Sequence, residues 1–307
     1  MNILSLRYLL KIAEHGSITR AASELHITQP ALTRHVAQLE GVLRVKLLKR
    51  HGRGVCLTEP GLLLSARAKT ILADIDDLSE ALLARQTEPQ GELSVGMPYS
   101  WSENITAPVI KQFHDRYPDV RLKIIADSSE TLESMLKERY IDFAVLTMVE
   151  DSPEIDSRPI VHDRIYLLGA KGSGLAQMKE VPLAELAARP IIHQHNATVV
   201  VKRLNQRLTR FGREQNVVVK STASMMLELA ELGVGFVAMP GCALSSRRYE
   251  LETAPITNFS ITWTVSTLRT RPSSAAVKAY ETLLRQAIRT RMSSGEWPGG
   301  TLVKGAF

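Results

Sequence analysis

Residues 16–40 read GSITRAASELHITQPALTRHVAQLE, and this stretch decides the fold of the first part of the chain. Gly16 ends the preceding helix, and Ser17 and Thr28 have side chains that cap the next two helices. Pro30 falls in the first turn of the last helix, where its missing N–H loses no hydrogen bond. Apolar residues recur at helical spacing on the inner faces of these two helices: Ile18, Ala21, Ala22 and Leu25, then Leu32, Val36, Leu39 and Leu43. Two short helices joined by a tight turn predict a helix-turn-helix.

The outer face of the second helix is polar without the Glu and Lys mixture of an ordinary solvated surface: it carries Gln29, Thr33, Arg34 and Gln38. Glutamine can pair with adenine through two hydrogen bonds, and arginine can pair with guanine or a phosphate. Threonine offers a hydroxyl and a methyl group, and Pro30 adds a rigid apolar edge. These residue types predict a helix that reads base edges in a DNA groove, and the alternative for any one of them is a solvated side chain.

The next stretch, VKLLKRHGRGVCLT, predicts two short strands over residues 45–49 and 54–57. The Gly-containing turn between them carries Arg50 and Arg53, so we predict a hairpin wing with a basic tip. Residues 1–58 hold 9 of the 38 Lys and Arg residues and 3 of the 32 acidic residues, a net charge of +6, and the remaining chain is neutral. A basic module on a neutral body is typical of a DNA-binding domain.

A long helix is predicted to follow Thr58, its N-cap, with Pro60 tolerated in the first turn. Six apolar residues repeat along it at intervals of four and three, the seam of a coiled coil: Leu64, Ala68, Ile71, Ile75, Leu78 and Leu82. We therefore predict that residues 59–90 form a dimerising linker helix and a hinge. The alternative is a helix packed on its own domain.

Beyond residue 91 strands and helices alternate, which predicts an α/β fold with parallel sheets covered by helices. The length of this part, residues 91–295, predicts two lobes with a cleft between them. We assign lobe I to about 91–162 and 269–295, and lobe II to about 163–268, with a long strand over 260–268 that can cross between the lobes. The Gly-rich residues 296–307 are predicted to form a flexible tail.

The chain resembles the LysR-type transcriptional regulators over residues 6–291. Three stretches carry the resemblance: GSITRAASELHITQPALTRHVAQLE, LLKRHGRGVCLTEPG and, with less detail, ELGVGFVAMP. The family joins a winged helix-turn-helix and a coiled-coil linker helix to a two-lobed effector domain similar to periplasmic binding proteins. The resemblance therefore implies a sequence-specific DNA-binding regulator that a small molecule controls, and not an enzyme.

The resemblance also implies roles for individual residues. Positions that face DNA bases in the family match Gln29, Pro30, Thr33 and Arg34, and positions near phosphates or the minor groove match Arg50 and Arg53. Family behaviour implies an interrupted palindromic operator, a homodimer or homotetramer, and RNA polymerase as a further partner. The chain departs from the family pattern in the wing, the linker helix and the effector-pocket loop, at Arg44, Pro60, Asp127 and Arg139.

Hydroxyl side chains follow the predicted strands at the sheet edge where ligands of such folds bind. With a histidine they form one candidate effector set: Ser100, Ser102, Ser129, Thr147, His193 and Thr198. The resemblance places inducer-binding hydroxyls at four of these positions, Ser100, Ser129, Thr147 and Thr198. Because helix N-termini favour negative charge, we predict a small anionic effector, whether a carboxylate, a sulfate-like ion or an amino acid. The alternative for each Ser or Thr is helix capping, and Trp101 is either a wall of the cleft or a core aromatic.

Other chemistries find little support. The GVGF stretch at 233–236 follows a predicted helix and precedes a strand, the reverse of a dinucleotide-binding turn. His193 and His195 lack carboxylate or cysteine partners for a metal ion, so we expect no cofactor. Cys56 and Cys242 are predicted to be free thiols, with a redox-sensing pair as the alternative.

Other protein classes explain only part of the chain. A solute-binding protein would explain the lobes but not the basic module, and a DNA-processing enzyme would need an acidic metal cluster. No apolar run approaches the ~18 residues of a membrane span and no export signal is recognisable, so we expect a cytoplasmic protein. The sequence leaves open the effector's identity, the operator and its genes, activation or repression, and dimer or tetramer.

Overall fold

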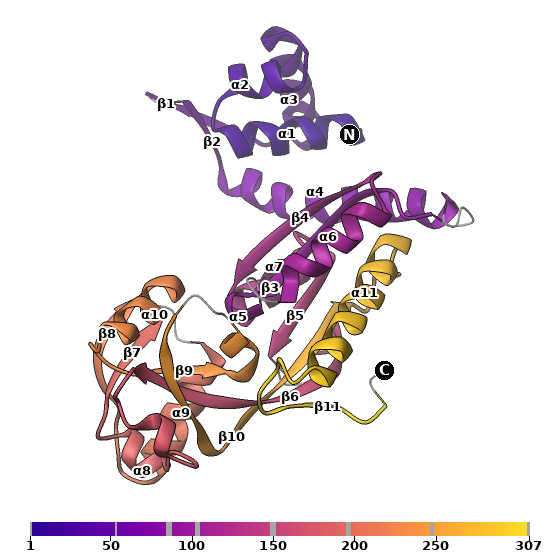
Figure 1. Cartoon of the computed structure of the whole chain (residues 1–307). Helices are drawn as coiled ribbons and strands as arrows, with labels where there is room; N and C mark the ends of the chain where they lie inside the picture. The colour runs from indigo at the N-terminus through magenta and orange to yellow at the C-terminus, as the bar shows by residue number, and fades with distance from the viewer. Residues whose placement is uncertain are drawn as a thin grey trace. The chain divides into compact units, whose positions relative to one another are not determined.

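The computed structural model describes residues 2–52, 54–83, 88–101, 105–147, 152–194, 198–245 and 249–305, and for residues 50, 69, 70, 73, 74 and 76–83 it describes the backbone alone (Figure 1). The chain divides into two compact units, Met1–Arg85 and Gln86–Phe307. The first is helical with one hairpin, and the second is built on a large sheet. Each unit is described by itself.

The described part of the first unit contains a helix-turn-helix, a hairpin and a long helix: α1 (Ile3–His15), α2 (Ile18–Glu24), α3 (Gln29–Leu43), β1 (Leu48–His51), β2 (Gly54–Leu57) and α4 (Glu59–Leu83). Gly16 ends α1 in the left-handed conformation, at φ 59°. The Ser17 hydroxyl accepts the N–H of Arg20 at 3.4 Å. The Thr28 hydroxyl accepts the N–H of Ala31, also at 3.4 Å. The predicted winged helix-turn-helix and its caps are confirmed.

The inner face of α3 packs into the core of this unit. Leu32, Val36 and Leu39 are buried there against α1 and α2. Leu43 was predicted to join them, but 36% of its surface is exposed, so that prediction is wrong. The physical reason is that α3 ends at this residue, because Arg44 adopts the left-handed conformation at φ 56° and turns the chain.

The first strand of the wing begins later than predicted. β1 starts at Leu48 instead of residue 45, because Glu40 holds the preceding backbone. Its Oε1 accepts the N–H of Leu47 at 2.8 Å and that of Leu48 at 3.3 Å, and Leu47 is fully buried. β1 still pairs with β2 in antiparallel register, so the hairpin is present but displaced.

The long helix α4 uses part of its predicted seam within its own unit. Ala68 is fully buried in a core shared with α1 and α3, and Leu64 packs against that core. These two residues contact their own unit, as in the alternative of a helix packed on its own domain, because spacings of four and three suit such a helix as well. The dimerising role of the seam stays a prediction. For the rest of the seam, Ile71 is exposed and Ile75 partly so, while the side chains of Leu78 and Leu82 lie outside the description.

The described strands of the second unit form one seven-stranded and one two-stranded sheet. The strands are β3 (Gly91–Pro98), β4 (Val120–Asp127), β5 (Phe143–Thr147), β6 (Ile155–Ala170), β7 (Pro190–Gln194), β8 (Asn216–Ser221), β9 (Val237–Pro240), β10 (Leu251–Leu268) and β11 (Gly300–Leu302). The helical segments are α5 (Tyr99–Trp101), α6 (Ala107–Arg116), α7 (Ser129–Lys137), η2 (Leu175–Gln177), α8 (Leu183–Leu186), α9 (Val199–Arg210), α10 (Ala223–Glu231), η3 (Gly241–Ser245) and α11 (Ala275–Ser293). The predicted α/β fold is confirmed.

The large sheet is mixed, which corrects the prediction of parallel sheets. Its order is β11-β6-β10-β5-β3-β4, with β9 paired to β6, and β7 pairs with β8 separately. β3 runs parallel to β4 and β5, as βα alternation predicts. β10 is antiparallel to both β5 and β6, because it returns through the sheet from the opposite end.

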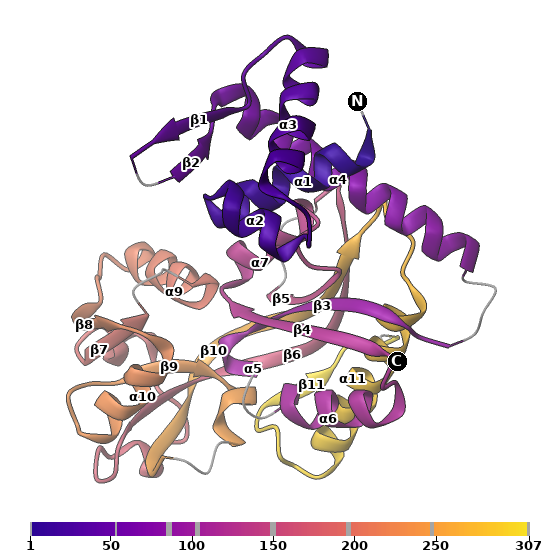
Figure 2. The same cartoon turned by 90° about the horizontal axis from the view of Figure 1, so that it is seen from above.

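β6 and β10 run side by side along the unit (Figure 2). They pair in antiparallel register, with a shift of register between Pro255 and Ser260. The strand predicted over 260–268 covers only the second half of β10. Proline is uncommon inside a strand, and Pro159 and Pro255 belong to β6 and β10. Both prolines lie within the observed strands, which are 16 and 18 residues long.

Residues 296–305 form ordered structure in the segment where a flexible tail was predicted. Within residues 296–307, the segment Gly300–Leu302 forms β11 and pairs with β6. Trp297 is 4% exposed and its ring lies 5.3 Å from that of Trp101. The abundance of glycine was misleading, because a buried aromatic residue anchors the segment.

Candidate nucleic-acid interface and ligand pocket

The outer face of α3 presents the residues predicted to read DNA. Gln29, Pro30 and Arg34 are exposed in its first two turns. Thr33 is partly buried, and its hydroxyl donates to the carbonyl of Gln29 at 2.9 Å. Toward a base, Thr33 therefore offers its methyl group and an acceptor oxygen.

The acidic residues of positions 1–58 are all engaged in ion pairs: Lys11 with Glu14 at 3.0 Å and Glu24 at 2.6 Å, His15 with Glu24, and Lys46 with Glu40 at 2.7 Å. The hydrogen bond from Lys11, followed by that from His15, lowers the pKa of Glu24. Among the described residues Arg34 forms no ion pair, so its charge is available to a phosphate or a guanine.

The wing residues are placed in part. Arg50 lies in β1, where its backbone pairs with Val55. Its side chain is outside the description, and so is the whole of Arg53. Their contacts with phosphates or the minor groove stay a prediction.

A pocket of about 90 Å³ lies within the second unit, between the ends of strands of the large sheet and the segments β7, α9 and α10. Five residues of the predicted effector set line it: Ser100, Ser129, Thr147, His193 and Thr198. The sixth, Ser102, lies outside the described residues. The structure thus brings together side chains from both halves of the predicted cleft.

Three helices begin at this pocket. Ser129, Val199 and Ala223 are the first residues of α7, α9 and α10, and all three line the pocket. The first N–H groups of a helix lack intrahelical acceptors and carry partial positive charge. The arrangement therefore favours a negatively charged group.

Ser129 and Thr147 form a buried pair in the wall. Ser129 Oγ accepts the N–H and the hydroxyl of Thr147, both at 3.0 Å. A hydroxyl has two acceptor lone pairs and one donor, so the O–H of Ser129 remains to donate. Ser128 caps α7, accepting the N–H of Thr131 at 3.2 Å, so the capping alternative does not account for Ser129.

Thr198 is at once a helix cap and a pocket residue. Its Oγ1 accepts the N–H of Val201 at 3.4 Å, which leaves its O–H to donate. His193 is buried and hydrogen-bonded through Nε2 to Gln215. Burial, with a smaller effect of Lys220, lowers the pKa of His193 against the opposing effect of Gln215. His193 is therefore mostly neutral at pH 7 and brings no positive charge to the pocket.

Of the two alternatives for Trp101, the core aromatic is confirmed, and another tryptophan lines the pocket. Trp101 is fully buried in the core, with its ring 5.4 Å from that of Trp263 and 5.3 Å from that of Trp297. Trp263 lines the pocket instead. It lies inside a strand, where an aromatic residue suggests sheet packing, so the sequence held no signal for this role.

A buried carboxylate lies next to this cluster. Asp163 accepts the indole N–H of Trp263 at 2.9 Å and the backbone N–H of Cys242 at 3.2 Å. Burial raises the pKa of Asp163 against the opposing effect of the hydrogen bond from Trp263. Burial, and then the nearby Asp163, raise the pKa of the Cys242 thiol well above its ordinary value. A redox-sensing cysteine needs an accessible thiolate, so Cys242 has the environment of a structural thiol.

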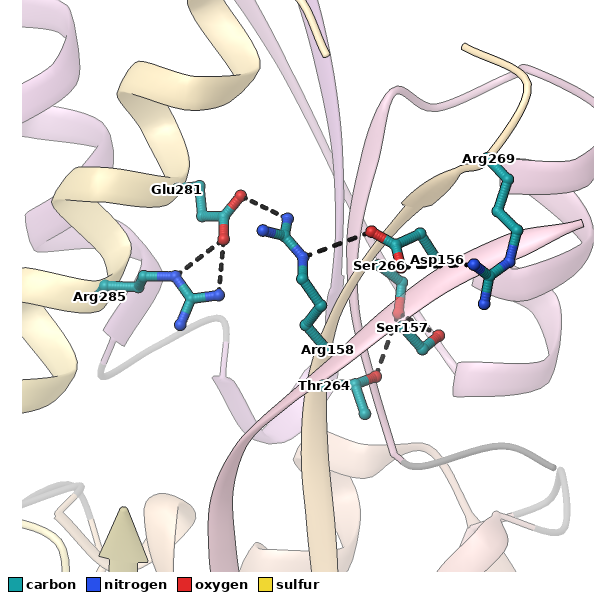
Figure 3. A network of polar contacts seen from close by, with 8 residues as sticks. All are labelled: Asp156, Ser157, Arg158, Thr264, Ser266, Arg269, Glu281 and Arg285. Carbon is teal, nitrogen blue, oxygen red and sulfur yellow. Dashed lines mark hydrogen bonds and ion pairs between the residues drawn. The ribbon is translucent and has the colours of Figure 1, made fainter. Parts of the chain in front are cut away.

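A network of ion pairs ties α11 to β6 and β10 (Figure 3). Glu281 of α11 accepts hydrogen bonds from Arg158 of β6 at 2.8 Å and from Arg285 Nε at 2.8 Å. Asp156 lies between Arg158 and Arg269, at 3.5 and 3.8 Å. Hydroxyl bonds of 2.9 and 3.1 Å continue the network through Ser157, Ser266 and Thr264. These contacts hold the long strands to the helix that covers them.

The described part of the chain has neither a metal-binding cluster nor a membrane-spanning helix. There, His, Cys, Asp and Glu side chains form no group of three or more that could hold a metal ion, and His195 lies outside the description. In the same residues no helix has the length and apolar character needed to cross a membrane.

Family models match both units. The model of the bacterial regulatory helix-turn-helix proteins of the lysR family matches residues 3–62. The model of the LysR substrate binding domain matches residues 86–289. Together they cover the α3 face and the pocket.

Similar proteins include the transcriptional regulator BbuR of Bordetella bronchiseptica, 25% identical over 96% of this chain and 92% of its own length. The nitrogen assimilation regulatory protein nac of Klebsiella aerogenes is 29% identical over 80% of each chain. Among solved structures, full-length OxyR of Pseudomonas aeruginosa has a TM-score of 0.74 at 21% identity, over 94% of this chain and 95% of that one. CbnR with its target DNA has a TM-score of 0.68 at 20% identity, over 94% and 100%. The chain belongs to the LysR family: it is a DNA-binding transcriptional regulator with a substrate-binding domain, and not an enzyme.

Proposed function

We propose that this regulator reads a palindromic operator with the exposed face of α3 and responds to a small anionic effector held in the pocket of the second unit. The observation that carries the DNA part is the exposed face of α3, where Gln29, Pro30 and Arg34 are available and the nearby acids are paired elsewhere. Thr33 supplies a methyl group and an acceptor. In this proposal the wing contacts phosphates or the minor groove with Arg50 and Arg53.

The chain acts as a homodimer or homotetramer, because one α3 contacts too few base pairs for specificity and two-fold symmetry matches a palindrome. The remaining seam of α4 joins the copies, through Ile71, Ile75, Leu78 and Leu82. The solved complex of CbnR with its target DNA supports the DNA partner. RNA polymerase is the further partner, and the site of action is the cytoplasm, where bacterial DNA lies.

The effector acts through the two lobes. An anion in the pocket accepts hydrogen bonds from Ser129 and Thr198 and approaches the N-terminus of α9. Binding favours one arrangement of the lobes, and this population shift changes the spacing of the DNA-reading heads. The buried pair Ser129–Thr147 supports this part of the proposal, because it presents a donor to the pocket.

Replacing Arg34 or Gln29 with alanine is expected to weaken operator binding by about 1–3 kcal/mol and to relax base preference at the contacted position. Each loss removes a pair of hydrogen bonds to one base. Gel shifts with competitor DNA at fixed salt measure the affinity, and footprints measure the preference. Arg20→Ala, which removes the same charge from α2, is the control and should weaken all sequences alike. Unchanged affinity and preference in Arg34→Ala and Gln29→Ala would contradict the assignment of α3.

Replacing Thr198 with valine or Ser129 with alanine is expected to weaken effector binding by about 1–3 kcal/mol, because each change removes a donor to a charged acceptor. Operator affinity without effector should stay unchanged. Calorimetry with a panel of small organic acids and amino acids measures the binding. Ser134→Ala, an exposed hydroxyl of α7 bonded to the carbonyl of Glu130, is the matched control. If both pocket variants bind every active compound as the natural chain does, this pocket is not the effector site.

A further inference from the structure

One carboxylate lies in the wall of the effector pocket. Asp127, the last residue of β4, lines the pocket and is partly buried. Its Oδ1 accepts the N–H of Ser128 at 2.7 Å. Burial, and then the charge of Asp127, raise the pKa of Tyr99, which lines the same pocket. The carboxylate therefore acts on groups inside the pocket.

The described lining of the pocket offers Asp127 no cation. It contains no lysine or arginine, and no ion pair of Asp127 is found in the described part of the chain. His193 is mostly neutral at pH 7, because burial lowers its pKa. Lys202, in the first turn of α9, is paired with Glu130 at 2.9 Å. A ligand with negative charge alone would meet an uncompensated like charge here.

The hydrogen-bond donors of the pocket come from other residues. The O–H groups of Ser129 and Thr198 remain to donate, because their oxygens already accept bonds from the protein. Val199 and Val200, the first two residues of α9, add backbone N–H groups that no intrahelical acceptor can satisfy. These groups match a carboxylate of the ligand, while Asp127 matches a cationic donor.

Apolar side chains make up much of the remaining wall. Ile192, Val200, Met226 and Trp263 line the pocket and are buried. These side chains match a short, largely apolar body of the ligand.

We infer that the effector is a small zwitterion, an amino acid or a close derivative. Its ammonium group binds Asp127, and its carboxylate binds the hydroxyls of Ser129 and Thr198 and the N-terminus of α9. This inference rests on the proposed function, because it names the chemical class of the ligand in the same pocket.

The test uses the full-length chain with glycine and the L-amino acids that carry a primary α-amino group, each paired with the acid in which hydrogen replaces that group. Calorimetry of the natural chain should show binding by at least one amino acid with a short, largely apolar side chain. Its deaminated partner should bind about 10- to 100-fold more weakly, because a charge-assisted hydrogen bond is lost. Asp127→Asn should remove most of this preference. Glu130→Gln, a neighbouring acid outside the pocket lining, should keep it.

Three outcomes overturn the inference: no amino acid binds, a deaminated acid binds as tightly as its partner, or Asp127→Asn keeps the preference. Gel shifts of the operator with the same samples separate this failure from failure of the proposed function. If deaminated acids bind as tightly as the amino acids and change the operator complex, the proposal of an anionic effector is supported and the inference of a zwitterionic effector is wrong. If operator binding itself is absent, the proposed function fails.

Discussion

Replacing Trp101 with alanine is expected to lower the free energy of unfolding of the second unit by about 3–5 kcal/mol. Trp101 is fully buried, and its ring meets those of Trp263 and Trp297 edge to face at 5.4 and 5.3 Å. Alanine would leave a cavity at the junction of β3, β10 and the end of the chain. Removing so large a side chain loses both its burial and two aromatic contacts.

The chain offers a selective probe for this measurement. Its three tryptophans, Trp101, Trp263 and Trp297, all lie in this cluster of the second unit. Their fluorescence during denaturant unfolding therefore follows the second unit alone. Trp101→Phe is the control and should lose less, because an aromatic ring still fills part of the site. A loss below about 1 kcal/mol in Trp101→Ala would show that Trp101 does not hold this core.

Leu32→Ala is expected to destabilise the first unit by about 2–5 kcal/mol and to reduce operator binding through the unfolded fraction. Leu32 is fully buried at the centre of the core that α3 shares with α1 and α2. A domain of this size has a total stability of about 5–15 kcal/mol, so the loss is a large share. Far-UV circular dichroism follows the helices of both units, so a loss of helix signal at a denaturant concentration where tryptophan fluorescence is unchanged reports unfolding of the first unit. Gel shifts follow DNA binding.

The matched control for Leu32→Ala lies on the same helix. Val42 is 62% exposed, and Val42→Ala should change stability by less than about 0.5 kcal/mol. Tryptophan fluorescence should report the same unfolding midpoint in both variants, because no tryptophan lies in the first unit. A shifted fluorescence midpoint in Leu32→Ala would contradict the prediction that the two units unfold independently. If Leu32→Ala kept the helix signal and the operator affinity of the natural chain, Leu32 would not hold the core of the first unit.

Local signals explain why the first unit could be predicted well. Ser17, Thr28 and Gly16 act on backbone groups within a few residues, so their sequence positions are enough to place the helix ends. The apolar spacing of α3 predicts burial correctly except at Leu43, where the helix ends. The seam of α4 shows what spacing cannot predict. Ala68 packs inside its own unit, because the spacing of apolar residues shows which face of a helix is buried but not what covers it.

Distant contacts explain most of what the sequence missed in the second unit. The return of β10 makes the sheet mixed, and nothing near β10 in the chain signals its neighbours. Trp297 fixes the end of the chain by packing on Trp101, nearly 200 positions away in the sequence. For the pocket, hydroxyls after strands were predictable because strand ends converge. Asp127 was visible only as a departure from the family pattern, and Trp263 had no local signal.

The pairing of β6 with β10 limits how the walls of the pocket can move. Two strands joined by a ladder of hydrogen bonds resist sliding past each other, because sliding would break every bond of the ladder. They twist more readily, because twisting spreads small dihedral changes over many residues. The register shift between Pro255 and Ser260 interrupts the ladder, and Asn258 there has φ 51°. At this point the paired strands bend and twist most easily. We therefore expect a ligand that draws the walls together to twist the paired strands about their long axis, instead of sliding one strand past the other.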